Sequence, residues 1–163
     1  MRGTYTIIVT SRSNGHRVFG CLGRVRLRRG NYLYTGSAMG TGSTSLERRL
    51  QRHIARSKTV RWHIDYLTSW PSCKVTGAVY VVSSKRLECK ANRLIARELK
   101  LHPVLPRIGA SDCECDGHLL GPELRLSKAA LLKRLTKVYS RLTVNESSSE
   151  RVAQIGCPSS HLF

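Results

Sequence analysis

Hydrophobic and polar residues are arranged along the first forty positions in a way that is typical of β-strands. The run TYTIIVT at 4–10 is rich in β-branched and aromatic residues, and the turn residues SRSNGH follow it. Glycines interrupt RVFGCLGRVRLRRG at 17–30, so we expect a bent or two-part strand there. NYLYTGSA at 31–38 predicts a strand that breaks at Gly36, and VTGAVYVVSS at 75–84 predicts another.

Elsewhere the apolar residues recur every three to four positions, which favours amphipathic helices. In 45–57, Leu46, Leu50 and Ile54 form such a stripe, and Ser45 or Thr44 can cap the helix. The same pattern predicts helices over 61–70, 85–101 and 127–142. The order of elements indicates an α+β fold with a small, mostly antiparallel sheet, flanking helices and a basic C-terminal helix.

The length of 163 residues favours one domain, which we place at 1–143. Residues 106–124 read as a structured loop. From 144 to 163 the composition turns to Ser and other polar residues, which predicts a loosely held tail.

The charge balance points to a polyanionic partner. Lys and Arg number 28 against 10 Asp and Glu, a formal net charge of +18. Nucleic acid is the first candidate, because neutralised phosphates release counterions, and an anionic membrane surface is the second. The sequence has no run of eighteen apolar residues, and its first apolar stretch is too short for a signal peptide. We therefore expect a cytoplasmic, nucleoid-associated protein with reduced cysteines.

One side of helix 45–57 carries residues suited to chemistry. Arg49 and His53 lie beside the apolar stripe and one turn apart, where the sheet is expected, whereas Arg48 and Arg52 point to the solvent side. A guanidinium held against a sheet can grip a phosphate with two hydrogen bonds. The alternative is that Arg49 is an ordinary basic surface residue.

Other candidate residues are ambiguous when taken singly. Tyr32 and Tyr34 share one face of their strand, as half-buried strand residues often do. Glu88, near the beginning of helix 85–101, has the position of a helix-dipole partner, and Glu98 is a rival acid on the same helix. His63 follows Trp62, a pairing that is typical of packing.

Taken together, these residues resemble the GIY-YIG nuclease superfamily. The segments GNYLYTGSAMGTG, LERRLQRH, WHIDYL and IGASDCECDGHL are similar to its small stand-alone Uri-type endonucleases, over about residues 3 to 120. The positions that carry the resemblance, in matching order, are Tyr5, Tyr34, Ser37, Arg49, His53, His63 and Glu88. The resemblance implies a three-stranded antiparallel sheet with flanking helices, and a metal-dependent endonuclease acting on double-stranded DNA.

The resemblance also implies roles. Glu88 would hold one divalent metal, Mg²⁺ or Mn²⁺, and Arg49 would stabilise charge on the scissile phosphate. Tyr5 or Tyr34 would activate or position the attacking water, and His53 or His63 would take up its proton. A phenol has a reference pKa near 10, so we expect the metal, Arg49 or a histidine to depress it.

The match has departures that bear on the general base. Thr4 and Thr35 replace the usual central isoleucines, and SAMGT at 37–41 lacks a lysine found in some relatives. The identity of the general base therefore stays open.

The segment DCECDGH offers Cys113, Cys115 and His118 as ligands for a structural zinc. Tetrahedral zinc needs four ligands, and Cys157 or His161 from the tail could supply the rest. The resemblance favours a different reading, in which this stretch packs near the active face and Ser111 or Asp112 assists the substrate.

Further basic residues are candidates for DNA contact. Ser37, Arg48 and Arg52 are three such candidates. The last helix adds a basic face formed by Lys128, Lys133, Arg134 and Lys137. Repair of damaged or mismatched DNA suits a stand-alone domain. The competing hypothesis is a non-catalytic, basic nucleic-acid-binding protein that keeps only the fold.

Overall fold

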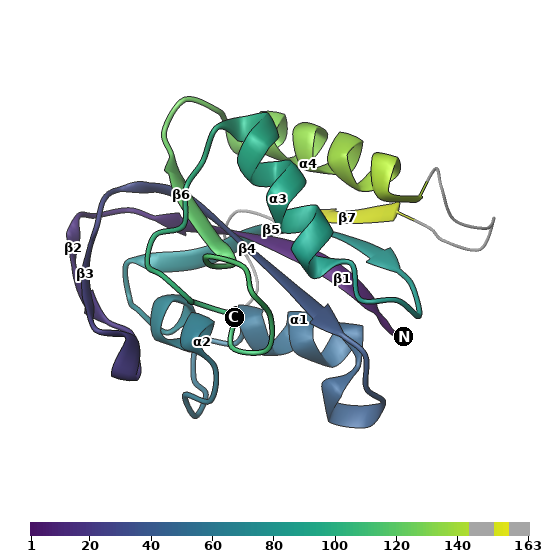
Figure 1. Ribbon diagram of the computed structural model, residues 1–163. Coiled ribbons are helices and arrows are strands. Elements are labelled where there is room, and N and C mark those ends of the chain that lie inside the picture. The colour runs from purple at the N-terminus through teal and green to yellow at the C-terminus, as the bar shows by residue number, and fades with distance from the viewer. Residues whose placement is uncertain (144–151, 157–163) are drawn as a thin grey trace.

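The computed structural model describes residues 1–143 and 152–156. Its centre is a five-stranded antiparallel sheet with the strand order β6-β4-β1-β5-β7 (Figure 1). The strands are β1 (Gly3–Ser11), β4 (Gly30–Ala38), β5 (Cys73–Val82), β6 (Leu119–Glu123) and β7 (Val152–Gly156). A separate antiparallel hairpin joins β2 (Gly15–Val18) to β3 (Arg24–Leu27) through a short 3₁₀ turn, so the chain reverses direction where one bent or two-part strand was expected over 17–30.

Helices cover both faces of the sheet. Figure 1 shows α1 (Leu46–Ile54) and α2 (His63–Thr68) below it, and α3 (Glu88–Leu99) and α4 (Lys128–Thr143) above it. The strand period of two divides the core accordingly. Tyr32 and Tyr34 pack in the core with α1 and α2, whereas Leu33 packs in the core with α3 and α4.

The α+β class is confirmed, but the sheet is larger than the three strands that the sequence suggested. The central strands β4, β1 and β5 were expected, and β6 and β7 extend the sheet on either side. β6 lies in the segment read as a loop. β7 lies within 144–163 and pairs with β5, and the rest of that predicted tail is outside the described residues.

Two local predictions were wrong. β4 does not break at Gly36, because it pairs with β1 without interruption from Gly30 to Ala38. Ile54 does not face the core: it is 48% exposed, whereas His53 is only 1% exposed. Two helical turns take about 7.2 residues, so His53, seven positions after Leu46, faces the sheet and Ile54 is rotated away from it.

The N-cap of α1 was predicted correctly, since the Arg48 amide donates to Ser45 Oγ over 3.5 Å. Within the described residues, no helix has the length and apolar character needed to cross a membrane.

Candidate active site

A cleft of about 330 Å³ opens beside β4, past the point where its pairing with β6 ends at Tyr34. β4, α1, α2, the beginning of α3 and the loop before β6 all contribute to its wall. The residues predicted from the sequence that line it are Tyr34, Ser37, Arg49, His63, Glu88, Ser111, Asp112 and His118. The structure thus brings together residues that are up to 84 positions apart in the chain.

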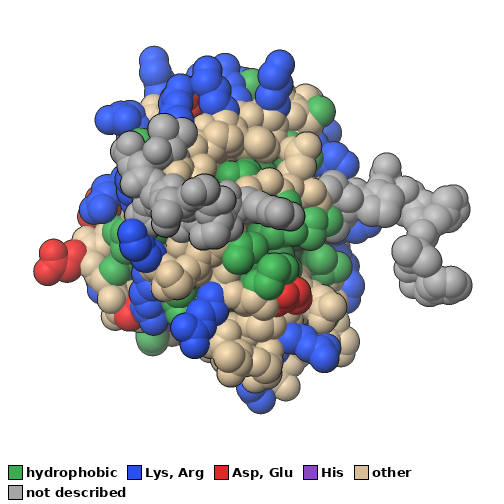
Figure 2. All heavy atoms as spheres, turned by 90° about the vertical axis from the view of Figure 1, so that its right-hand side faces the viewer, with side chains coloured by type: hydrophobic (Ala, Val, Ile, Leu, Met, Phe, Trp, Pro, Cys, Tyr) green, Lys and Arg blue, Asp and Glu red, His purple; other side chains and the backbone are tan. Residues whose placement is uncertain are grey.

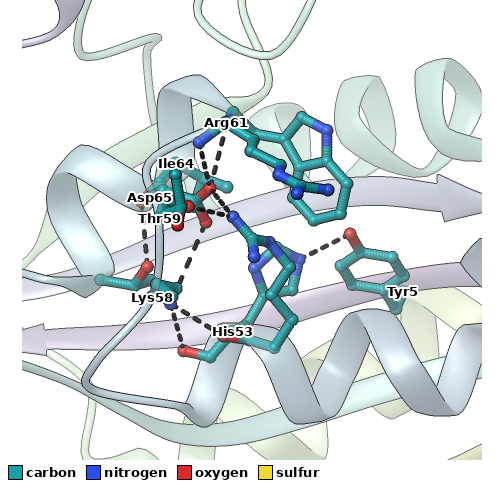
Figure 3. A network of polar contacts seen from close by, with 10 residues as sticks. Tyr5, His53, Lys58, Thr59, Arg61, Ile64 and Asp65 are labelled. Atoms are coloured by element: carbon teal, nitrogen blue, oxygen red, sulfur yellow. Dashed lines mark hydrogen bonds and ion pairs between the residues drawn. The ribbon is translucent and has the colours of Figure 1, made fainter. Parts of the chain in front are cut away.

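Tyr5 and His53 form a buried pair behind the cleft. The Tyr5 hydroxyl and His53 Nε2 share a hydrogen bond of 2.7 Å (Figure 3). The centroid of the His53 ring lies 5.4 Å from that of Tyr5 and 5.9 Å from those of Tyr34 and Trp62. Burial, together with the nearby cation Lys58, lowers the pKa of His53 to about 3. His53 is therefore a neutral imidazole at pH 7.

The two tyrosines are less acidic than the sequence led us to expect. Burial raises the pKa of Tyr5 to about 12, although the Arg49 guanidinium acts to lower it. Burial also raises the pKa of Tyr34, and Tyr5 adds to the rise. The expectation that Arg49 or a histidine depresses the phenol pKa is therefore wrong for the protein groups alone, because desolvation outweighs the attraction of Arg49.

Glu88 lines the cleft and has one carboxylate oxygen without a hydrogen-bond partner among the described residues. The residue is 7% exposed, and its Oε1 lies 3.9 Å from Arg86 Nη1. Among the described residues, Oε2 is buried and has no hydrogen-bond partner. The Leu87 amide donates to Thr4 Oγ1 over 3.1 Å and so ties the beginning of α3 to β1. A buried carboxylate oxygen with available lone pairs suits a hard divalent cation such as Mg²⁺.

The rival acid Glu98 has a different environment. It does not line the cleft, and its Oε2 accepts a hydrogen bond of 3.1 Å from Arg141 on α4. Glu98 therefore joins the two helices on their side of the sheet.

Arg49 and Arg52 stack on the same indole ring. Their guanidinium carbons lie 4.7 Å and 4.8 Å from the centroid of Trp62. Arg49 lines the cleft, and within the described part of the chain its buried Nε has no hydrogen-bond partner. Because Arg49 lines the cleft, its positive charge is placed to meet an anion there.

Arg52, expected on the solvent side, is instead bound by protein atoms. Its Nη2 donates to Asp65 Oδ2 over 2.6 Å and also to the Thr59 carbonyl. Asp65 is fully buried, accepts from the backbone amides of Arg61 and Trp62, and lies 4.0 Å from Lys58 Nζ (Figure 3). Burial would raise the pKa of Asp65, but these hydrogen bonds and Arg52 hold it below its ordinary value. We call Asp65, Arg52 and Lys58 the Asp65 cluster.

Two glycines make room for the tyrosines. A Cβ on Gly36 would lie 2.8 Å from the Tyr5 hydroxyl oxygen. Gly109 has a φ of +69°, and a Cβ there would lie 2.6 Å from Tyr34 Cε2. Larger residues at these positions would displace the phenols.

The family of the chain follows from a comparison of its sequence with family models. The model of the domain of unknown function DUF123 matches residues 4–144, most of the chain. The chain belongs to the DUF123 family. This family is GIY-YIG-like and of unknown function, so the resemblance is confirmed at that level. No curated protein and no solved structure matches the chain.

The DUF123 domain contains a second group of side chains beside the cleft. Cys89, Cys113, Cys115 and His118 place one ligand atom each within 4.8 Å of all the others, and could hold a metal ion. Burial raises the pKa of Cys89 to about 12, as do the neighbouring thiols of Cys115 and Cys113. The sequence pointed to three of these residues and missed Cys89. The tail residues considered as further ligands, Cys157 and His161, lie outside the described residues.

The basic residues predicted to contact DNA are divided between two surfaces of the DUF123 domain. Figure 2 shows Lys and Arg side chains along the upper rim, at the level of α3 and α4 in Figure 1. The predicted residues on α4 are Lys128, Lys133, Arg134 and Lys137. They do not line the cleft, and neither does the exposed Arg48. Arg61, which the sequence analysis did not single out, is exposed and does line it.

Proposed function

We propose that this DUF123 domain is a Uri-type, metal-dependent endonuclease that hydrolyses phosphodiester bonds in double-stranded DNA. One observation carries the proposal: Glu88, whose buried Oε2 has no hydrogen-bond partner among the described residues, lines the same cleft as Arg49. A phosphodiester with a bound divalent cation would provide a partner for each. The net charge of +18 suits a polyanionic substrate.

Glu88 would hold the cation, Mg²⁺ or Mn²⁺, which when bound would supply Lewis-acid stabilisation of the reacting phosphate. Arg49 would donate to phosphate oxygens and stabilise the charge that builds there. Trp62 supports the Arg49 guanidinium by stacking and restricts where it can point.

The pKa values indicate how the proton is handled. Tyr5 and His53 have pKa values of about 12 and about 3. A raised pKa of Tyr5 and a lowered pKa of His53 both disfavour transfer of the Tyr5 proton to His53 by the protein groups alone. Tyr5 therefore serves best by holding His53 in place among the rings of Tyr34 and Trp62. Tyr34 and His63 both line the cleft, so they are the better candidates to orient the attacking water and to accept its proton.

Repair is the biological role that we infer for such a stand-alone domain. DNA would enter the cleft past Arg61 and Ser37, and the protein would recognise the lesion or mismatch there. The basic face of α4 covers the opposite side of the sheet from α1, so it would add affinity at a distance from the reacting phosphate.

The test is single-turnover cleavage of labelled duplexes that carry a panel of damaged and mismatched bases. The full chain is used in excess over DNA, with Mg²⁺ added or omitted. Omitting the metal, rather than adding a chelator, avoids disturbing the cysteine group. We expect cleavage of at least one duplex that depends on Mg²⁺ or Mn²⁺. Tight, salt-sensitive binding to every duplex without cleavage would instead identify a non-catalytic binding protein.

A further inference from the structure

We propose that Cys89, Cys113, Cys115 and His118 form a structural Zn²⁺ site that fastens the first turn of α3 to the loop before β6. This site is separate from the cation position at Glu88 and does not depend on nuclease activity. Three of its ligands come from one short loop, and Cys89 comes from the helix.

The spacing of the ligand atoms suits a tetrahedral ion. His118 Nε2 lies 3.6 Å from Cys113 Sγ and 3.9 Å from Cys89 Sγ. Zinc bonds of about 2.3 Å to sulfur and about 2.0 Å to nitrogen would place tetrahedral S and N ligands about 3.5 Å apart, and two sulfurs about 3.8 Å apart. Since all four ligand atoms already lie within 4.8 Å of one another, shifts of about 1 Å or less would close the site.

The ligand chemistry selects zinc over the hard cations. Thiolates and imidazole are soft or borderline ligands, whereas Mg²⁺ and Ca²⁺ prefer oxygen. No carboxylate belongs to the group among the residues the structure describes. Four protein ligands fill a tetrahedral shell and leave no position for substrate, which is the pattern of a structural site.

The loop is already shaped to present its ligands. Arg107 Nη1 donates to the carbonyl of Cys113 over 2.6 Å and to that of Cys115 over 3.2 Å. The His118 amide donates to the Ile108 carbonyl over 2.7 Å and fixes the residue that carries the imidazole. These bonds fix the loop backbone at the three ligands that the loop supplies.

Between α3 and the loop, one hydrogen bond is formed by Asn92, whose side-chain amide donates to the Gly117 carbonyl over 2.8 Å. Zinc would add a second link one turn earlier, at Cys89. Glu88 precedes Cys89, and Ser111, Asp112 and His118 line the cleft. The ion would therefore fix the relative position of the carboxylate and the opposite wall of the cleft.

The first experiment measures metal content. The full chain is purified from zinc-supplemented medium, and bound zinc is determined by plasma mass spectrometry. The variants Cys89→Ser and Cys113→Ser are compared with Cys21→Ser, which removes an exposed cysteine outside the group. We expect one zinc per chain in the wild type and in Cys21→Ser. Loss of a group that only hydrogen-bonds to a metal ligand weakens metal binding about 10–100-fold, so loss of a thiolate ligand itself should weaken it by more than about 100-fold.

Cobalt substitution checks the ligands themselves. Co²⁺ bound to the wild-type chain should show thiolate-to-metal charge transfer and the intense visible bands of tetrahedral coordination. Both should weaken in Cys89→Ser and be unchanged in Cys21→Ser. Wild-type chain that holds no zinc or cobalt, or equal metal binding by Cys89→Ser and Cys21→Ser, would overturn the proposal. The proposal would also be overturned if two of these cysteines formed a disulfide that persisted under reducing purification and prevented metal binding.

A second measurement covers the case in which the cysteine variants do not fold. Zinc is removed from the wild-type chain with a chelator and then returned, and amide hydrogen exchange is followed over 107–118 and the first turn of α3. We expect faster exchange without zinc and recovery of protection when zinc is returned, because binding to the native state stabilises it. Identical exchange in the two forms would show that no zinc links the loop to the helix.

Discussion

Arg49 and Arg52 lie three residues apart on α1 and stack on the same indole ring, yet their environments are opposite. Arg52 is paired with a fully buried carboxylate and a backbone carbonyl. The Nε atoms of both arginines lack a hydrogen-bond partner among the described residues, so the difference lies at the end of each guanidinium: Arg52 Nη2 is bound by the protein, whereas Arg49 faces the cleft. The contrast separates an arginine that stabilises the fold from one that is available to a ligand.

The same contrast extends to the surroundings of each arginine. In the Asp65 cluster, Asp65 Oδ2 accepts three hydrogen bonds with protein groups. In the cleft, Glu88 Oε2 is buried, and no described residue donates to it. A buried polar group without a partner costs about 1–3 kcal/mol. Asp65 Oδ1 also lacks a hydrogen-bond partner among the described residues, but the Lys58 ammonium lies 4.0 Å from it. Only Glu88 of the two acids lines the cleft, which is why we assign chemistry to the cleft and stability to the cluster.

The largest effect on cleavage should come from Glu88→Gln. The amide keeps the shape of the side chain but loses the charge that would hold the cation. We expect single-turnover cleavage to fall at least about 1000-fold, or ~4 kcal/mol. Stability to denaturant should be unchanged or slightly higher, because a buried carboxylate oxygen without a partner is replaced.

Glu98→Gln is the matched control for this change. It alters the rival acid on the same helix, which is partly exposed and paired with Arg141. Cleavage should stay within about twofold of the wild type, since exposed ion pairs contribute about 1 kcal/mol or less to stability. If Glu98→Gln abolished cleavage and Glu88→Gln did not, the assignment of the cation position would be reversed.

Asp65→Ala should have the opposite effect to Glu88→Gln: the free energy of unfolding should fall, and cleavage by the folded protein should change less. Removing one partner of a buried ion pair costs about 3–5 kcal/mol. We expect about 3 kcal/mol because Arg52 is partly exposed. Chemical denaturation followed by tryptophan fluorescence and by circular dichroism measures it. Asp112→Ala, which breaks the exposed pair with Arg86, is the control and should cost about 1 kcal/mol or less.

The two arginines can be compared directly by substitution. Arg49→Ala should slow single-turnover cleavage on the order of a hundredfold, or ~2.7 kcal/mol, with little change in stability. Arg49→Lys should restore little, because an ammonium cannot form the two-pronged contact. Arg52→Ala should lower stability and leave cleavage of the folded fraction nearly intact. Equal losses of cleavage in both alanine variants would mean that this face of α1 is only a diffuse positive patch.

Part of the cleft could be predicted from the sequence, because it follows from the strand period of two residues and the helical period of about 3.6 residues. Strand alternation places Tyr32 and Tyr34 on one side, and the helical period places Arg49 and His53 toward the sheet. The same reasoning misplaced Ile54, since a stripe spaced every four residues drifts off the face after two turns.

What the sequence did not reveal depends on tertiary contacts. Arg52 pairs with Asp65 across a connection whose path no periodicity describes. Cys89 is a lone cysteine in a helix until the loop before β6 folds against it. β6 contains Gly121 and Pro122, which are loop signals, and becomes a strand by pairing with β4.

The smallest effect that we predict concerns His53, which lies between the cleft and the Asp65 cluster. Its folded pKa of about 3 is below the ordinary histidine value of 6.5. As the pH falls below 6.5, the unfolded chain therefore binds the proton and the native chain does not. This contribution to stability is complete above pH 6.5 and declines toward pH 3, by about 1.4 kcal/mol per pH unit at most.

His53→Gln should remove this slope, whatever it does to the absolute stability, and the exposed His102→Gln should keep it. Burial also lowers the pKa of His118, which adds a slope of the same sign, so the share of His53 is the difference between the wild type and His53→Gln in unfolding free energies measured between pH 6.5 and about 4.5. The contribution of Asp65, whose folded pKa is lowered from 3.8, is lost only at lower pH, as the pH falls through that folded value. Parallel pH curves for wild type and His53→Gln would mean that His53 gains its proton without unfolding. The imidazole would then have an ordinary pKa in the folded protein and could accept a proton from Tyr5, so Tyr5 and His53 would have to be assigned to the catalytic site.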